Sequence, residues 1–344
     1  MLFSKTPYRI SFFGGGTDYP EWHRREGGAV VSTTIDKYCY ISCRHLPPFF
    51  NEKHRIVWSH IETVSSIAEI LHPAVREGLT LLGFDDSRGL EIHHQGDLPA
   101  RSGMGSSSSF SVGLLNVLTA LRGGTIDRHA LALKAIELEQ DVLKENVGSQ
   151  DQVAAAYGGF NRIDFATDGA IRVEPVRITP ARRAELEAHL LLVFTGASRL
   201  GSEVAAAMKG TMAAKADELR RMRKLVDEAL GVLEGMGPLA AFGELLHRGW
   251  ELKRGLSARV TNPKIDAIYD AARAAGATGG KLLGAGATGF MVFFAPPEQH
   301  DAVRRALPQH LWVPFRFSDE GSRILLEGFR SDEGGGHRNP PPAS

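Results

Sequence analysis

The segment Pro99–Gly113, which reads PARSGMGSSSSFSVG, restricts the possible fold and ligands of this chain more than any other segment. Two glycines and four consecutive serines stand before an apolar run of helical length, Val112–Leu121. Glycine lets a backbone adopt positive φ and approach a ligand closely, so that several N–H groups of such a loop can converge on an anion. The positive end of the following helix would face the same point, and the serine hydroxyls add donors. The pattern suits a nucleoside triphosphate with its magnesium ion.

A serine-rich helix cap on a flexible loop would have the same composition, and the segment alone does not decide between the two interpretations. It is not a Walker loop, because no Gly-Lys-Ser or Gly-Lys-Thr follows the glycines. Other parts of the sequence have to discriminate.

Length and charge exclude several classes of protein. A chain of 344 residues is long enough for two domains, and 43% hydrophobic with 23% charged residues is typical of globular proteins. The formal net charge of zero argues against a nucleic-acid binder. No apolar run reaches the roughly 18 residues that span a bilayer, and the first residues lack the pattern of a signal peptide. We therefore expect a cytoplasmic protein with neither a nucleic-acid nor a membrane partner.

The two cysteines, Cys39 and Cys43, lie in a segment that alternates like a strand. Residues four apart on a strand share a face but lie about 13 Å apart, which is too far for a disulfide. A metal site built on these two alone is equally disfavoured. We expect reduced thiols in the core, as is usual for a cytoplasmic protein.

Strands and helices are mixed without a regular βαβ period, which favours an α+β fold over a doubly wound sheet. The composition predicts strands over residues 9–13, 29–34, 38–44, 90–94, 160–165, 170–175, 190–195 and 290–294. Helices are predicted over 109–121, from a cap at Asp127 to about 144, through the periodic apolar residues 208–233, and from a cap at Asn262 to 276.

A charged stretch over residues 179–187 predicts a boundary between two domains. We therefore expect an N-terminal domain over 1–185 that contains the serine-rich loop, and a C-terminal domain over 186–330. The tail over 331–344 is rich in glycine, proline and polar residues and is predicted to be disordered.

A second candidate region follows the strand that carries Arg9, where Gly14–Gly16 precede Thr17 and Asp18. Three adjacent glycines let a ligand contact the backbone. The carboxylate of Asp18 could accept hydrogen bonds from neighbouring hydroxyls of a sugar. An Asx turn before the following proline would also explain an aspartate at this position.

Two further carboxylates are candidates for chemistry. The helical neighbours of Glu139, three and four residues away, are all apolar: Ala135, Ile136, Val142 and Leu143. A buried carboxylate needs a partner, which a cation bound with phosphate oxygens would supply; otherwise the side chain reaches water at the edge of the apolar stripe. Asp151 precedes a run of small residues, so it could orient a substrate hydroxyl and take its proton, or simply cap a helix.

At these positions the sequence resembles the GHMP kinases, a family that includes galactokinase, homoserine kinase, mevalonate kinase and phosphomevalonate kinase. Three motifs carry the resemblance, Pro7–Tyr19, Pro99–Ser109 and Gly279–Gly289, and they occur in the order of the family. The resemblance covers about residues 5 to 330. It implies an N-terminal ribosomal-S5-like domain, a C-terminal ferredoxin-like domain and a site between them.

The resemblance also implies roles for individual residues. Asp151 matches the catalytic aspartate of the family, Arg9 matches a basic residue near it, and Ser106 and Glu139 match ligands of Mg²⁺. Residues expected to bind ATP are Arg101, Ser102, Gly103, Met104, Gly105, Ser106, Ser107 and Ser108. Residues expected at the substrate are Gly15, Gly16, Thr17, Asp18 and Arg199.

A sugar that already carries a phosphate needs a cationic partner, and Arg199 is the first candidate because it follows a strand and a glycine. Lys209 and Lys281 are weaker candidates. A solvated loop residue is an equally good interpretation of Arg199.

Within the family, the segments FFGGGTDY and ENVGSQDQ resemble the bacterial heptokinases. This implies transfer of a phosphoryl group from ATP to the anomeric hydroxyl of D-glycero-α-D-manno-heptose 7-phosphate, giving the 1,7-bisphosphate for GDP-heptose and surface polysaccharide synthesis. The partners would then be ATP and a sugar phosphate, with a homodimer left open. Galactokinases have Gly-Glu-His where this chain has three glycines, which disfavours galactose. A fucose or mannose 1-kinase and a non-catalytic family member are the alternatives, and a decarboxylase of the mevalonate branch is more distant.

Overall fold

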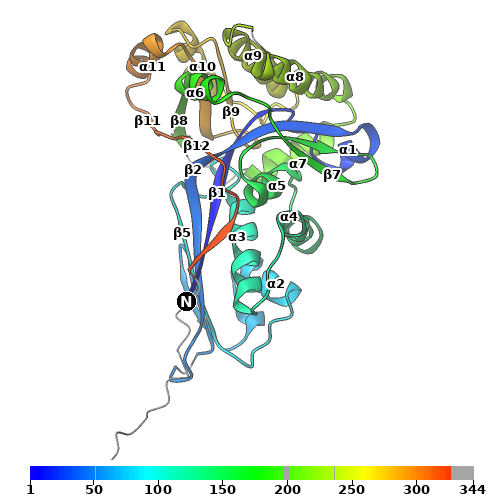
Figure 1. Cartoon of the computed structure of the whole chain (residues 1–344), viewed down its shortest axis with the longest axis vertical. Helices are drawn as coiled ribbons and strands as arrows, with labels where there is room; N and C mark the ends of the chain where they lie inside the picture. The colour runs from blue at the N-terminus through cyan, green and yellow to red at the C-terminus, as the bar shows by residue number, and fades with distance from the viewer. Residues whose placement is uncertain (51, 197–200, 236, 327–344) are drawn as a thin grey trace, which may run out of the picture.

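The computed structural model describes residues 1–50, 52–196, 201–235 and 237–326, and its core is built on two sheets (Figure 1). In the larger sheet the strands follow the order β13-β1-β2-β5-β3-β4, with β12 and β6 also paired to β2, and β7 to β6. Its strands are β1 (Leu2–Phe13), β2 (Gly28–His45), β3 (His54–Val57), β4 (Ile61–Val64), β5 (Leu90–Gly96), β6 (Phe160–Phe165), β7 (Ile171–Pro175), β12 (Phe317–Ser318) and β13 (Arg323–Leu326).

The smaller sheet follows the order β11-β8-β10-β9 and is antiparallel throughout. Its strands are β8 (Leu190–Gly196), β9 (Gly279–Leu282), β10 (Gly289–Phe294) and β11 (Leu311–Trp312). The helices are α1 (Pro20–Glu26), α2 (Pro73–Leu81), α3 (Ser106–Leu121), α4 (Arg128–Ile136), α5 (Gln150–Tyr157), α6 (Pro180–Ala188), α7 (Gly201–Thr211), α8 (Ala216–Glu234), α9 (Ala240–Arg254), α10 (Pro263–Ala274) and α11 (His300–Ala306). The predicted α+β class is confirmed.

Helix α3 lies along β1 and β2 and begins at Ser106, three residues earlier than predicted (Figure 1). A Cβ on Gly113 would lie 2.7 Å from the hydroxyl of Thr6 and 3.1 Å from that of Ser4, both on β1. The glycine therefore lets the helix approach the strand closely. In the first turn of α3, the hydroxyl of Ser109 donates to the carbonyl of Pro7 at 2.8 Å, which places the start of the helix beside the part of β1 that carries Arg9.

Helix ends elsewhere follow the predicted caps. The carboxylate of Asp127 accepts hydrogen bonds from the N–H groups of His129 and Ala130, and Asn262 caps α10 in the same way. The periodic residues 208–233 divide between two helices, α7 and α8, rather than forming one. In the part of the chain that the structure describes, no helix combines the length and the apolarity needed to cross a bilayer.

Strand β2 differs from the prediction of two strands, because it runs without a break from Gly28 to His45. The residues between the two predicted strands are held by a distant segment: the N–H of Asp36 donates to the carbonyl of Arg316, and the N–H of Arg316 donates to the carboxylate of Asp36, both at 2.9 Å. The partner lies 280 residues away, so local sequence could not predict the continuity.

The two cysteines of β2 confirm the predicted reduced thiols. Cys39 and Cys43 are buried and free. Burial raises the pKa of both thiols, that of Cys43 to about 12. They are therefore unreactive core residues.

Aromatic side chains join the two sheets. Phe242 of α9 packs against Phe12 and Phe13 of β1 with ring centroids 5.4 and 5.2 Å apart, and against Phe294 of β10 at 5.9 Å. The end of β1 is thereby fixed beside the smaller sheet. Strands β12 and β13 return from the smaller sheet to pair with β2 and β1. The predicted division near residue 185 falls within α6 and stays a prediction.

Candidate active site

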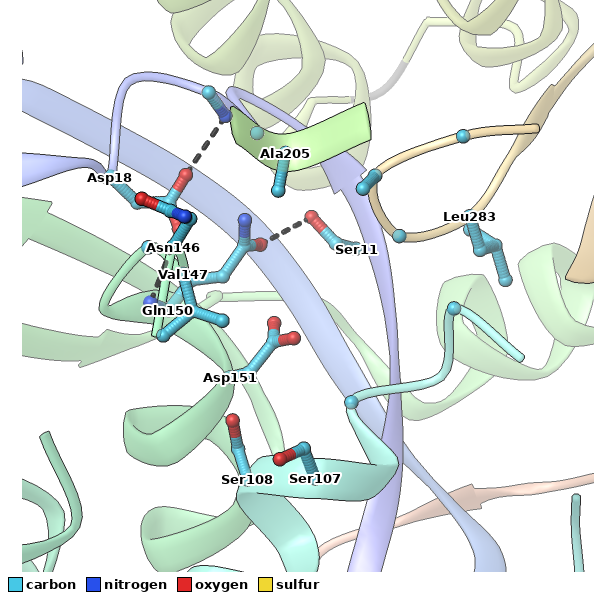
Figure 2. A pocket seen from close by; sticks show the side chains of 18 of the residues that line it. Ser11, Asp18, Ser107, Ser108, Asn146, Val147, Gln150, Asp151, Ala205 and Leu283 are labelled. Carbon is cyan, nitrogen blue, oxygen red and sulfur yellow. Dashed lines mark hydrogen bonds between the residues drawn. The ribbon is translucent and has the colours of Figure 1, made fainter. Parts of the chain in front are cut away.

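A cavity of about 530 Å³ opens where the end of β1, the start of α3 and the loop after β9 meet. Its wall also includes the turn before α1, the segment 143–151 and the last turns of α9. Figure 2 shows Asp151 in the middle of this space, with Ser107 and Ser108 on one side and Asp18 on another. All three motifs of the sequence analysis thus contribute to one cavity.

The serine-rich loop owes its shape to two glycines with positive φ, Gly103 at +82° and Gly105 at +74°. A Cβ on Gly103 would lie 2.5 Å from the carbonyl oxygen of Leu283, and one on Gly105 would lie 3.5 Å from the carboxylate of Asp151. A larger residue at Gly103 would therefore push the loop away from Leu283, whereas at Gly105 the positive φ, and not a lack of space, favours glycine. Gly105 is also the residue before the first turn of α3, whose N-terminus faces the cavity.

Not every residue of the loop lines the cavity. Arg101, Gly103, Gly105 and the serines 106–108 do so. Ser102 and Met104 do not, and their contact with ATP stays a prediction. The hydroxyl of Ser102 donates to the carbonyl of Pro99 at 2.6 Å, and the side chain of Met104 is fully buried in the core.

Arg9 and Asp151 form a bidentate ion pair at the centre of the cavity. The Nε and Nη2 of Arg9 donate to the two carboxylate oxygens of Asp151 at 2.7 and 2.6 Å, and its Nη1 donates to the carbonyl of Gly103 at 2.8 Å. Arg9 is only 3% exposed, whereas the Asp151 side chain is 25% exposed. The arginine is therefore a fixed support, and the carboxylate keeps one side open to a ligand.

Asp18 is buried at the far end of the same cavity, where its carboxylate accepts hydrogen bonds from the N–H of Gly16 at 2.8 Å and the N–H of Gln150 at 3.3 Å. Burial raises its pKa, the charge of Asp151 raises it further, and hydrogen bonds from the backbone of Gly16 and the side chain of Gln150 oppose the rise. Gln150 is itself held by the Ser11 hydroxyl, which donates to it at 2.6 Å (Figure 2).

Gly15 and Gly16 line the cavity as expected, but Thr17 does not. The hydroxyl of Thr17 is buried within hydrogen-bond distance of the carbonyls of Gly14 (2.8 Å) and Ala29 (3.1 Å). These bonds fix the turn that presents Asp18, and a contact between Thr17 and the substrate stays a prediction.

Glu139 lies on a π-helical turn, Glu137–Val142, and is completely buried. One of its oxygens accepts from the hydroxyl of Ser108 at 2.8 Å and from the side-chain amide of Gln152, and the other accepts from the hydroxyl of Ser111 at 2.7 Å. Burial raises the pKa of Glu139 to about 7, which these serine and glutamine donors partly offset and the charge of Glu145 increases.

Besides Ser108, which is buried, a second cavity serine contacts Glu139: the exposed Ser107, whose Oγ lies 3.4 Å from the carboxylate. Ser106, the residue expected to share an ion with Glu139, instead accepts a hydrogen bond from the N–H of Arg101 at 3.0 Å. Both serines line the cavity, and Glu139 stands behind them. Over the described ranges, no group of three or more His, Cys, Asp or Glu side chains could hold a metal by itself. An ion here would need oxygens from its ligand, as is common for Mg²⁺.

Sequence reasoning gave no role to Lys253, and only a weak one to Lys281, although both line the cavity. Lys253 lies three and seven residues after Trp250 and Leu246, two core residues of α9, so helical periodicity placed it on the buried face. Of the other cations considered, Lys209 pairs with Glu21 at 2.5 Å and Arg199 lies outside the described residues.

A helix N-terminus with serine hydroxyls, beside a carboxylate held by an arginine, is an arrangement suited to phosphoryl transfer. Family models agree with this class. The model of the GHMP kinases N terminal domain matches residues 63–159, and that of the GHMP kinases C terminal matches residues 217–311. The chain belongs to the GHMP kinase family, and it is a phosphotransferase with an alcohol group as acceptor.

Three relatives illustrate the position of the chain within the family. It is 29% identical to the D-glycero-alpha-D-manno-heptose 7-phosphate kinase of Campylobacter jejuni, over 92% of this chain and 97% of the relative. It is 26% identical to the bifunctional fucokinase/GDP-fucose pyrophosphorylase of Arabidopsis thaliana, over 88% of this chain and 31% of that relative. The crystal structure of a D-glycero-D-manno-heptose 1-phosphate kinase from Bacteriodes thetaiotaomicron superposes with a TM-score of 0.77, covering 95% of this chain and 99% of that one at 24% identity.

These findings confirm the predicted two-domain fold of the family and identify the chain as a sugar kinase that uses ATP.

Proposed function

We propose that this enzyme transfers the γ-phosphoryl group of ATP to the anomeric hydroxyl of D-glycero-α-D-manno-heptose 7-phosphate. The observation that carries the proposal is the Arg9–Asp151 pair, which lies between the serine loop and Asp18. The heptose kinase of Campylobacter jejuni supports the choice of sugar, and so do Gly15 and Gly16, which line the cavity without side chains. The product, a 1,7-bisphosphate, would enter GDP-heptose synthesis for surface polysaccharides in the cytoplasm.

In this mechanism Asp151 orients the reacting hydroxyl and accepts its proton. Arg9 occupies one lone-pair site on each carboxylate oxygen and fixes the plane of the carboxylate, so the remaining sites are available to the substrate. An anomeric hydroxyl is more acidic than an ordinary alcohol, so a strong base is not needed. Asp18 would hold neighbouring sugar hydroxyls, and most of the rate enhancement would come from positioning and charge stabilisation.

The serine loop and the N-terminus of α3 would bind the phosphates of ATP. Mg²⁺, when bound, neutralises charge on phosphate oxygens. It is commonly held in proteins by one or two carboxylates together with phosphates and water, so one buried carboxylate beside a hydroxyl fits it. Ser106 is engaged with the loop backbone, and Ser108 is buried and already donates to Glu139 at 2.8 Å, whereas Ser107 is exposed beside the carboxylate. Ser107 is therefore favoured, in place of Ser106, as the hydroxyl ligand that acts with Glu139.

The two serines can be separated by experiment. Ser107→Ala should raise the Mg²⁺ concentration for half-maximal activity by about tenfold or more, because it removes an oxygen beside the ion. Ser106→Ala should leave that titration nearly unchanged, since its hydroxyl is engaged with the loop backbone. A magnesium titration of initial rates at saturating ATP measures both. A shift in the Ser106 variant alone would restore the original assignment.

The glycine at position 148 offers a test of Asp18. A Cβ at this position would overlap the carboxylate of Asp18, so Gly148→Ala should displace that side chain. We expect kcat/KM for the sugar to fall by about 10- to 100-fold while KM for ATP stays almost constant. Gly231→Ala on α8 is the control, because its Cβ would meet open space. An unchanged kcat/KM for the sugar would remove Asp18 from the acceptor site.

The substrate is tested by a coupled ATPase screen over free and phosphorylated heptoses and hexoses, with fucose and mannose included. The highest kcat/KM is expected for D-glycero-α-D-manno-heptose 7-phosphate. Phosphorus–proton coupling in the NMR spectrum of the product should then place the new phosphate on the anomeric carbon. Preference for fucose or mannose would instead support the second candidate, a sugar 1-kinase like the fucokinase relative.

A further inference from the structure

Two buried lysines in the cavity wall have no role in the mechanism above. Lys253 lies on α9 and Lys281 on β9, and they are 7% and 6% exposed. Both line the cavity that contains Asp151. Lysine is almost never buried to this extent without a partner for its charge, so the pair requires an explanation.

Backbone carbonyls satisfy these ammonium groups only in part. Nζ of Lys253 donates to the carbonyls of Leu282 (2.7 Å) and Gly284 (2.5 Å), and Nζ of Lys281 donates to the carbonyl of Phe12 (2.8 Å). An ammonium group has three N–H donors. One donor of Lys253 and two of Lys281 are therefore left for a ligand in the cavity.

The positive charges of the two lysines also lack a negatively charged partner in the part of the chain that the structure describes. No ion pair among the described residues includes either lysine, and the carboxylate of Asp151 is taken by Arg9. Burial lowers the pKa of both amines, and so does positive charge nearby: that of Arg9 for both, and that of Lys281 for Lys253. The pKa of Lys281 falls to about 7. An anion bound between the two amines would raise both pKa values again and stabilise the charged forms.

We propose that Lys253 and Lys281 form a second phosphate subsite, which binds a terminal phosphoryl dianion. This deepens the proposed function and rests on it. The serine loop and the N-terminus of α3 already provide for nucleotide phosphates on another wall. Lys281 is anchored to β1 just before the turn that presents Asp18, and the charge of Asp18 acts on it. We therefore expect the phosphate already present on the sugar to be the occupant, and the γ-phosphate of ATP is the other source of the same chemistry.

Kinetics on paired acceptors distinguish the two sources. The variants are Lys281→Met and Lys253→Met, with Lys224→Met at an exposed position of α8 as the matched control. The acceptors are heptose 7-phosphate and the same heptose without its phosphate. If the subsite holds the sugar phosphate, kcat/KM for heptose 7-phosphate falls by about 10- to 100-fold and that for the free heptose changes little, since only the former loses charge-assisted hydrogen bonds. If the subsite holds the γ-phosphate, kcat/KM falls equally for both acceptors and KM for ATP rises.

Calorimetric titration of inorganic phosphate, with and without a non-hydrolysable ATP analogue, gives a readout that needs no turnover. Phosphate binding that persists with the analogue and is lost in Lys281→Met supports the sugar-phosphate source. Binding that the analogue blocks, with weaker analogue affinity in the variant, supports the γ-phosphate source. Unchanged kinetics and unchanged binding in both folded variants would overturn the subsite. If no sugar is turned over by the wild type, the proposed function fails while the titration still tests the lysines.

Lys253→Met also leaves two carbonyls without a donor, so its folding must be checked by thermal denaturation. Lys281→Met loses only one such bond and is the variant on which the test depends.

Discussion

Replacing Asp151 with Asn should lower kcat by about 10²- to 10⁴-fold, the contribution that a positioned general base typically makes. The amide has nearly the shape of the carboxylate, and its oxygen can still accept one of the two hydrogen bonds from Arg9. It cannot take the proton of the reacting hydroxyl. Steady-state rates with saturating ATP and acceptor measure the loss.

Nucleotide affinity provides the internal check on that variant. Because the serine loop does not depend on the charge of Asp151, the dissociation constant for ATP should stay within about threefold of the wild type. Asp141→Asn is the matched control, since Asp141 is exposed and does not line the cavity. Near-normal turnover in Asp151→Asn would refute the assignment of the base, and loss of ATP binding would mean that the loop itself had moved.

The parts of the fold that sequence predicted best are those set by local chemistry. Asp127 and Asn262 cap helices through their own neighbouring N–H groups, and the Gly103 and Gly105 loop takes the positive φ values that glycine permits. By contrast, the unbroken strand β2 needs Arg316 beside Asp36, a contact made only after the chain has folded. Local patterns carry no information on such pairings.

The site shows the same division. Arg9 and Asp151 are 142 residues apart, so spacing alone could not pair them, and the family resemblance brought them together. The family resemblance did not reveal that the hydroxyl of Thr17 donates a hydrogen bond to the carbonyl of Gly14 within the same turn. Nor did it reveal that the loop turns Ser106 toward Arg101 and leaves Ser107 beside Glu139. These details depend on backbone conformation, which motifs do not specify.

Replacing Glu139 with Gln should have opposite effects on activity and stability. The carboxylate is fully buried, and its pKa in the folded protein is about 7 against an ordinary value of 4.5. The folded state therefore binds more protons than the unfolded state between these values, so the wild type loses stability as pH rises from about 4.5 to 7. A neutral amide does not have to be ionised in a buried position. Glu139→Gln should therefore be more stable than the wild type above pH 7, by about 2 to 3 kcal/mol at most.

Activity should fall in the same variant, because the charge that would hold Mg²⁺ is gone. We expect a loss in kcat on the order of 100-fold, equivalent to about 2.7 kcal/mol of lost charge stabilisation, and a higher Mg²⁺ requirement.

Urea unfolding of metal-free protein at pH 5 and pH 8 measures the effect on stability. A magnesium titration of initial rates measures the effect on activity and on the Mg²⁺ requirement. Glu137→Gln is the control for both, because Glu137 lies on the same turn but is half-buried, with its side chain 42% exposed and paired with Lys134. A stability gain that is equal at both pH values would show that the carboxylate does not titrate in this window. An unchanged magnesium titration would show that Glu139 is not a ligand, and its burial beneath the serines would then serve only to fix the start of α3.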